Sequence, residues 1–350
     1  DIPRLDYTNG TASILLEPQS TNLFTYSQDF SLWSLNNSAS ISSNVVMSPD
    51  GTQNADKFII GSDNVAPFIL QNSAVTNGTM YSQTIYAKAG DTNILQMTGS
   101  TGFPTQYQNY NLLNGTLGNN NISGLTETSI QAVGNNWYRC VFTTSATETG
   151  AGCRIVIAIV SEGTGRLGGA GNVSNTGLYI FGAQLEALSY PTSYIPTSGS
   201  TVTRAAETLN NAGNSDLINS TEGVLYCEIA ALTDLGSYRL ISLSDGNLNQ
   251  RITILYDITD NKIYGQCVNS TTQAFIPFVP TSISNMNKIA FKYKANDFAL
   301  WVNGVEVGVD TSGVIPTGLD KLSFDRGDGV DDFYGKCKTI AVFKEALSDT

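Results

Sequence analysis

The feature that most constrains the fold is a series of short apolar segments separated by turn residues. Residues 81–89 (YSQTIYAKA) alternate in period two, as in a half-buried strand. Clusters of Gly, Asn or Ser bound each segment, and no long window shows the 3.6-residue apolar period of a helix. Asn303-Gly304 is the strongest hairpin signal. Many short strands at this spacing predict an all-β chain built from β-sandwich or jelly-roll domains.

The chain is long enough for two domains, since it has 350 residues. Residues 190–206 interrupt the strand pattern with two prolines and almost no apolar periodicity, which predicts an extended connector. The alternative is a long surface loop of one large sandwich. We therefore expect an N-terminal arm (1–13), a first β-domain (14–189), the connector and a second β-domain (207–350). Ile14-Leu15-Leu16 would begin the first sandwich and pair with residues 181–186, before the corner that Pro18 imposes.

Charged residues make up only 14% of the sequence, and the formal net charge is −12. Ser, Thr, Asn, Gln and Gly must then cover the surface, as is typical of extracellular or virion β-proteins. The acidic excess argues against a nucleic-acid partner and against an anionic membrane surface. No apolar run approaches the ~20 residues that span a bilayer, so we expect no membrane insertion.

Histidine is absent, which excludes Ser-His-Asp and Cys-His catalysis and every histidine-ligated metal site. A glycosidase that uses two carboxylates would survive this exclusion. Five cysteines occur without a C-x-x-C pair, which argues against zinc and against a dense disulfide framework. We expect small core residues, with a pairing of Cys140 and Cys153 as the alternative.

Several motifs resemble known families. In the first half these are residues 14–33 (ILLEPQSTNLFTYSQDFSLW), 49–58, 81–90, 135–140 and 181–207. They resemble a module of bacteriophage tail-fibre and other virion proteins, which is similar to carbohydrate-binding jelly rolls attached to glycan-degrading enzymes. In the second half, residues 219–232, 298–307 and 333–350 resemble concanavalin A-like and laminin-G-like sandwiches. The resemblance implies two β-sandwich domains in tandem, a jelly roll followed by a concanavalin A-like sandwich.

The resemblance also implies a role. The chain would be a non-enzymatic component of a phage tail fibre or spike on the virion surface, acting outside the cell. It would bind a host-surface carbohydrate or receptor through many weak contacts, as a homo-oligomer among other virion proteins. A purely structural or decoration protein of the virion is the alternative. A glycan depolymerase, or its accessory binding module, is the third hypothesis, because fold resemblance constrains function weakly.

Flat aromatic side chains are the natural platforms for sugar rings. Tyr107 and Tyr110 lie in an amide-rich stretch, although the same residues fit a strand with one aromatic face in the core. Trp301 alternates with apolar neighbours and so faces away from the core or lines a groove. Trp33 follows an aromatic series and also fits core packing. The tentative glycan-binding residues are Tyr107, Tyr110, Trp301 and Trp33.

A structural calcium ion is the one cofactor that the resemblance implies, since similar jelly rolls hold one near a sheet edge. Calcium needs six to eight oxygen ligands, and a single turn does not supply that many. The acidic run 325–332 lacks the register of an EF-hand and could equally be a solvated loop. The tentative ligands are Glu17, Asp50, Asp56, Glu186, Asp325 and Asp328.

Overall fold

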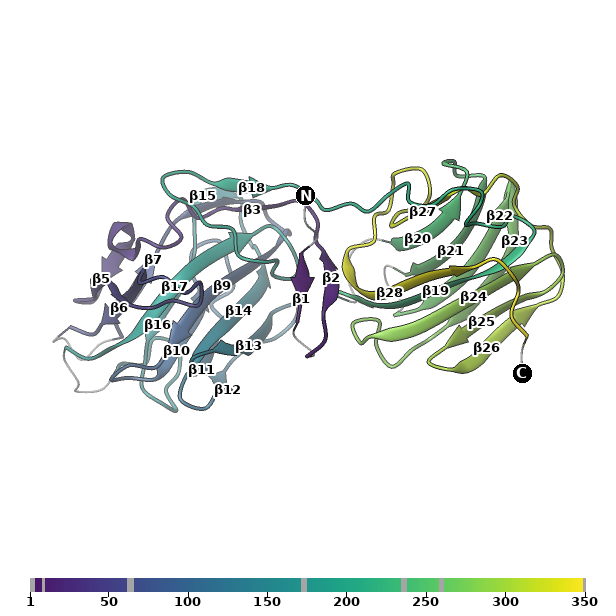
Figure 1. Ribbon diagram of the computed structural model, residues 1–350. Helices are drawn as coiled ribbons and strands as arrows, with labels where there is room; N and C mark the ends of the chain where they lie inside the picture. Colours follow the sequence, from purple (N-terminus) through teal and green to yellow (C-terminus); the bar gives the residue numbers. More distant parts are fainter. Residues whose placement is uncertain are drawn as a thin grey trace. The chain divides into compact units, whose positions relative to one another are not determined.

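The computed structural model describes residues 4–7, 10–61, 66–170, 175–233, 238–257 and 261–348. In these ranges it consists of β-strands, turns and one 3-10 helix, η1 (Phe30–Leu32). The chain forms two compact units, one made of Asp1–Pro18 with Ala206–Thr350 and the other of Gln19–Ala205 (Figure 1). The prediction of an all-β fold is confirmed.

The unit Gln19–Ala205 has two six-stranded antiparallel sheets around one hydrophobic core. One sheet has the order β12 (Thr116–Asn120), β11 (Tyr107–Asn111), β10 (Ile94–Gly99), β16 (Ile155–Ile159), β7 (Phe68–Leu70), β4 (Ser34–Asn36). The other has the order β13 (Glu127–Gly134), β14 (Trp137–Ser145), β9 (Met80–Lys88), β17 (Gly177–Glu186), β6 (Ala55–Ile59), β5 (Ser40–Val46). Two short pairs complete it: β15 (Gly150–Cys153) with β8 (Ser73–Val75), and β18 (Val202–Arg204) with β3 (Ser20–Asn22).

The other unit has a seven-stranded and a five-stranded sheet with a core of its own. The first has the order β1 (Leu5–Asp6), β2 (Ser13–Leu16), β28 (Gly335–Phe343), β19 (Glu222–Ala231), β24 (Asn287–Lys294), β25 (Phe298–Val302), β26 (Val305–Asp310). The second has the order β23 (Thr271–Phe278), β22 (Ile263–Asn269), β21 (Gln250–Tyr256), β20 (Arg239–Ser244), β27 (Lys321–Ser323). Asn303 and Gly304 join β25 to β26 with φ of 54° and 84°, as the two-residue hairpin predicted there requires.

The strand at Ile14 to Leu16 does not begin the first sandwich. It pairs with β28, with Ile14 opposite Cys337, and Leu16 is buried in the core of the second unit. Its apolar pattern predicted a strand correctly, but such a pattern does not name the partner strand. β1 extends the same sheet, so residues expected to form an arm contribute an edge strand. The unit Gln19–Ala205 is therefore an insertion between β2 and β19.

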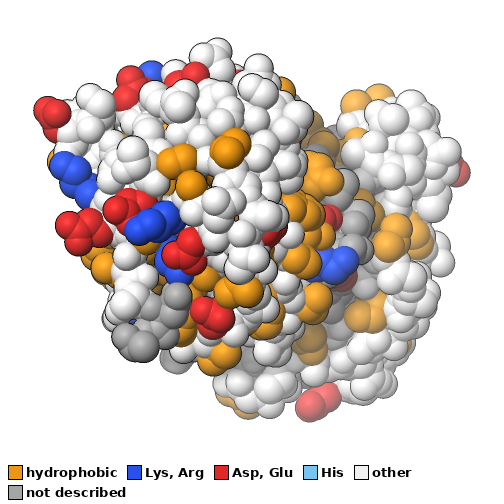
Figure 2. Space-filling model, turned by 90° about the vertical axis from the view of Figure 1, so that its right-hand side faces the viewer, with side chains coloured by type: hydrophobic (Ala, Val, Ile, Leu, Met, Phe, Trp, Pro, Cys, Tyr) orange, Lys and Arg blue, Asp and Glu red, His pale blue; other side chains and the backbone are white. Residues whose placement is uncertain are grey.

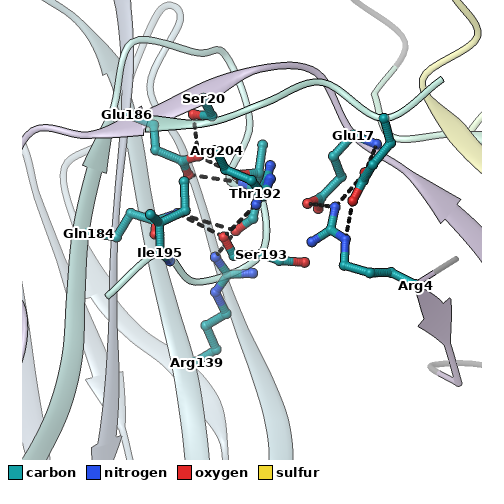
Figure 3. Close-up of polar contacts among 11 residues, drawn as sticks. Arg4, Glu17, Ser20, Arg139, Gln184, Glu186, Thr192, Ser193, Ile195 and Arg204 are labelled. Atoms are coloured by element: carbon teal, nitrogen blue, oxygen red, sulfur yellow. Dashed lines mark hydrogen bonds and ion pairs between the residues drawn. The ribbon is translucent and has the colours of Figure 1, made fainter. Parts of the chain in front are cut away.

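Residues 190–205 are not an extended connector. They belong to the unit Gln19–Ala205, where Thr192 and Ile195 are buried. Thr192 donates hydrogen bonds from its backbone N–H and hydroxyl to Glu186, and Arg139 donates to its carbonyl (Figure 3). The ring of Tyr194 lies 5.6 Å from that of Phe181. Residues 190–205 therefore pack on β17 and β14.

Candidate functional site

The candidate site is a groove on the outer face of the seven-stranded sheet, built by strand alternation on β19, β24 and β25. Leu225, Ile289 and Leu300 point into the core and are fully buried. Their neighbours point outward, since successive side chains of a strand face opposite sides. Tyr226 lies directly opposite Ala290, and Ala290 directly opposite Trp301. The small side chain thus separates two aromatic ones in one row across three strands.

The groove has a volume of about 370 Å³ and is bordered by Leu347 and Ser348 as well as by the sheet. Lys288 and Lys292 lie on β24 two residues on either side of Ala290 and line it. Nζ of Lys292 is 2.8 Å from Oδ1 of Asp297, which fixes that ammonium group. Burial first and the nearby Glu228 second raise the pKa of Tyr226, whose hydroxyl, like that of any tyrosine, is protonated at neutral pH.

The prediction that Trp301 faces away from the core is confirmed, because it is partly exposed and lines this groove. Most of the surface visible in Figure 2 is neither hydrophobic nor charged, with acidic and basic side chains interspersed. The Trp301 groove, which Val224, Tyr226, Ala290 and Leu347 also line, is a local apolar and aromatic surface.

Trp33 and Tyr110 are not glycan platforms, because both are buried. Trp33 packs against Phe24 and Phe30 at ring distances of 4.8 and 5.1 Å. The Tyr110 hydroxyl donates a 2.6 Å hydrogen bond to the carbonyl of Val141. Their alternative interpretation as core residues is correct. Tyr107 begins β11 and is partly exposed, but it belongs to the other unit and not to the Trp301 groove.

The acidic residues expected at a calcium site in the unit Gln19–Ala205 have protein partners. Asp56 accepts backbone hydrogen bonds from Phe30 and Asn44 at 3.2 and 2.9 Å. Glu186 accepts from Ser20 and Thr192. Asp50 closes its own turn by accepting from the side chains of Ser48, Thr52 and Asn54.

The other three expected ligands belong to the second unit and are engaged as well. Glu17 pairs with Arg4 at 2.6 Å, Asp325 accepts the backbone N–H of Gly327 and Asp328 pairs with Arg326 at 2.8 Å. Glu17 and Glu186 thus lie in different units and do not share a sheet edge. No cluster of three or more Cys, Asp or Glu that could hold a metal occurs among the described residues.

Three further residues of the Trp301 groove escaped the sequence analysis: Tyr226, Lys288 and Lys292. Alternation within GVLYCEIAA could have placed Tyr226 on the outer face. The register that sets it opposite Ala290 and Trp301 depends on strand pairing between distant segments, which that alternation does not encode.

All five cysteines are buried and none forms a disulfide, so the expected core role is confirmed and the pairing of Cys140 with Cys153 is not formed. Burial raises the pKa of the Cys140 thiol, which keeps it protonated. In the described ranges, no helix has the length and apolar character needed to cross a membrane.

Comparison with known proteins gives similarities of structure only. No family model matches this sequence, and no curated protein matches it either. A Ruminococcus gnavus sialidase CBM40 module bound to α2,3-sialyllactose is 14% identical, covers 41% of this chain and 92% of its own, and has a TM-score of 0.33. Domains LG4-5 of the mouse laminin α1 chain are 12% identical and have a TM-score of 0.29. The match covers 83% of this chain and 90% of the laminin chain. The fold class stated above rests on the sheets themselves, and the choice of ligand rests on the groove.

Proposed function

We propose that this chain is a binding protein that holds a cell-surface saccharide in the Trp301 groove. One observation carries the proposal: Tyr226 and Trp301 flank Ala290 in a groove open to solvent. Neighbouring strands are about 4.8 Å apart, so the two aromatic residues stand roughly 10 Å from each other across the middle strand. A pyranose ring presents an apolar face to such rings, and the hydroxyls at its rim can accept hydrogen bonds from Lys288.

The test is binding to an array of host-surface glycans, followed by titration of the best ligand. We expect Trp301→Ala to weaken the affinity roughly tenfold or more while the melting temperature stays unchanged, because the side chain is partly exposed. Tyr107→Ala removes a partly exposed aromatic residue from the other unit and is the matched control. Affinity lost in Tyr107→Ala and kept in Trp301→Ala would place the site elsewhere.

The setting that we propose is a phage tail fibre or spike, with the chain on the virion surface as a homo-oligomer. This part rests on the resemblance of the sequence motifs. Shallow grooves then gain avidity from the number of copies presented. Detection of the chain in purified phage particles by mass spectrometry supports it, and its consistent absence from such particles contradicts it.

A structural or decoration role is the second candidate, because the same groove could bury a side chain of a neighbouring subunit. The wild type would then bind no glycan, and Trp301→Ala would change the oligomeric state measured by sedimentation. Release of new reducing ends from host polysaccharide would instead revive the enzyme hypothesis. Without it, a binding role remains our proposal.

The structural calcium ion that the sequence resemblance implies is tested separately. Because the six expected carboxylates already have protein partners, we expect EDTA to leave the melting temperature unchanged. A fall that is reversed by added calcium would show that an ion binds and would contradict this expectation.

A further inference from the structure

A second groove lies on the outer face of the five-stranded sheet, and it contains a buried arginine that pairs with no carboxylate of the described residues. Ile252, Ile254 and Tyr256 of β21 point into the core, so Arg251 points outward, where it lines a groove of about 250 Å³. Although it faces outward, Arg251 is only 9% exposed.

The hydrogen bonds of Arg251 leave part of its guanidinium without a partner. Nη1 donates to the carbonyl of Leu248, and Nη2 lies 3.5 Å from Oε1 of Gln266. Nε is buried and has no hydrogen-bond partner, and no ion pair forms with Arg251 in the part of the chain that the structure describes. A buried guanidinium is costly unless hydrogen bonds and an opposite charge compensate it.

The loop that follows β27 packs beside Arg251, on its cross-strand neighbour Ser244. Gly327 packs on the sheet, where a Cβ atom would lie 2.9 Å from Cβ of Ser244. Arg326 of this loop enters the same groove, but it is paired with Asp328 at 2.8 Å and Asp331 at 3.1 Å. Its charge is therefore compensated, whereas that of Arg251 is not. Burial first and Arg326 second lower the pKa of Arg251, against an opposite effect of Asp328.

An aromatic surface adjoins the unpaired guanidinium. Tyr264 and Phe275 stack with ring centroids 4.4 Å apart and planes at 17°, and Phe275 is 47% exposed. Phe275 lies directly opposite Gln266 on the neighbouring strand, and Gln266 lies directly opposite Thr253, two residues from Arg251. Asp257 and Asp331 are the acidic residues that line the groove, and Asp331 forms an ion pair with Arg326.

We propose that this second groove binds a carboxylate-bearing saccharide, with the carboxylate on the free edge of the Arg251 guanidinium and a sugar ring against Phe275. A planar fork of N–H donors matches a carboxylate in two parallel hydrogen bonds, and an aromatic ring accepts the apolar face of a sugar. The ligand supplies the negative charge that the fold leaves out. The site lies on the other sheet from the Trp301 groove and does not depend on it.

The experiment is calorimetric titration of the full chain with a trimer of galacturonic acid, its uncharged methyl ester, and a trimer without carboxylates that carries sulfate groups instead. We expect binding of the uronate, at least tenfold weaker binding of the ester, and affinity that falls as salt is added. Arg251→Gln should lower the uronate affinity tenfold or more, and Phe275→Ala several-fold. Arg154→Gln, which removes one positive charge from the other unit, and Trp301→Ala should leave it unchanged.

Equal affinity for uronate and ester, an unchanged affinity in Arg251→Gln, or no binding of the uronate at millimolar concentration would each overturn the proposal. Preference for the sulfated trimer would overturn the carboxylate assignment. If Arg251→Gln fails to fold, the exposed Phe275→Ala decides by the same comparison of uronate with ester. The effect of Trp301→Ala on the binding of neutral glycans is measured in a separate titration. The proposal for one groove can therefore be contradicted while the proposal for the other stands.

Discussion

At the residue scale, exposure and partners decide which side chains are free to meet a ligand. Trp301 and Tyr110 are both aromatic residues on β-strands. Trp301 lines a groove, whereas Tyr110 is fully buried and its hydroxyl donates a hydrogen bond to the carbonyl of Val141. Burial raises the pKa of the Tyr110 phenol well above its usual value, consistent with a hydroxyl committed to the core. The residue type alone suggests a candidate for ligand binding, and the exposure of the side chain decides whether it can contact a ligand.

Asp50 provides a residue-scale test by pH. Against the effect of burial, hydrogen bonds from Asn54, Thr52 and Ser48 lower the pKa of Asp50 to about 2. A depressed carboxyl pKa stabilises the fold above the unfolded value near 4, and this contribution is lost as pH falls through about 2. We expect an NMR titration to show Asp50 ionised at pH 3 and Asn54→Ala to raise its pKa. An ordinary pKa in the wild type would show that the turn is not closed as described.

At the element scale, the short N-terminal strands are held where the chain leaves and re-enters their unit. Arg4 pairs with Glu17 at 2.6 Å and also with Glu207, and Figure 3 shows Arg4 directed toward Glu17. The backbone N–H of Glu207 donates to the carbonyl of Glu17 at 3.0 Å. A strand of four residues has few ladder hydrogen bonds. These contacts among Arg4, Glu17 and Glu207, which we call the clamp, therefore help to hold β2 in its pairing with β28.

Removal of the clamp provides the element-scale test. Arg4→Met leaves the buried carboxylate of Glu17 without its cation, and we expect a loss of about 1–3 kcal/mol in the free energy of unfolding. Lys57→Met is the matched control, because its ion pair with the half-exposed Asp91 lies at the surface, where solvent screening leaves it little effect on stability. Denaturant unfolding measures both. Equal losses in the two variants would show that the clamp is an ordinary surface pair.

At the scale of the whole molecule, one unit is inserted into the other. The chain passes between them twice, at Pro18 to Gln19 and at Ala205 to Ala206. In each unit, the two chain segments next to these crossings are joined to each other. In the unit Gln19–Ala205, β3 pairs with β18, and in the other unit the backbone N–H of Glu17 donates to the carboxylate of Glu207. The unit Gln19–Ala205 has its own core, whereas Ala206–Thr350 relies on Leu16 and β2 to complete a sheet.

Dissection tests this arrangement. We expect the fragment 19–205 to unfold cooperatively by itself, and the fragment 206–350 to be less stable because β28 becomes an open edge. A synthetic peptide of residues 1–18 should restore the stability of the second fragment by adding a strand. The same peptide with Leu16→Asp is the control and should not. Full stability of 206–350 without the peptide would show that the N-terminal strands are dispensable.

Local patterns in the sequence were enough to predict strands, the Asn303-Gly304 hairpin and the outward direction of Trp301, because alternation and turn chemistry act over neighbouring residues. The core cysteines followed from their apolar neighbours for the same reason. Other decisions belonged to the tertiary structure. It paired β2 with β28 across more than three hundred residues, folded residues 190–205 onto a sheet and buried Trp33 and Tyr110. It also left Arg251 without an acidic partner among the residues that the structure describes. Strand partners, register and burial arise from contacts between distant segments, and no pattern along the chain specifies them.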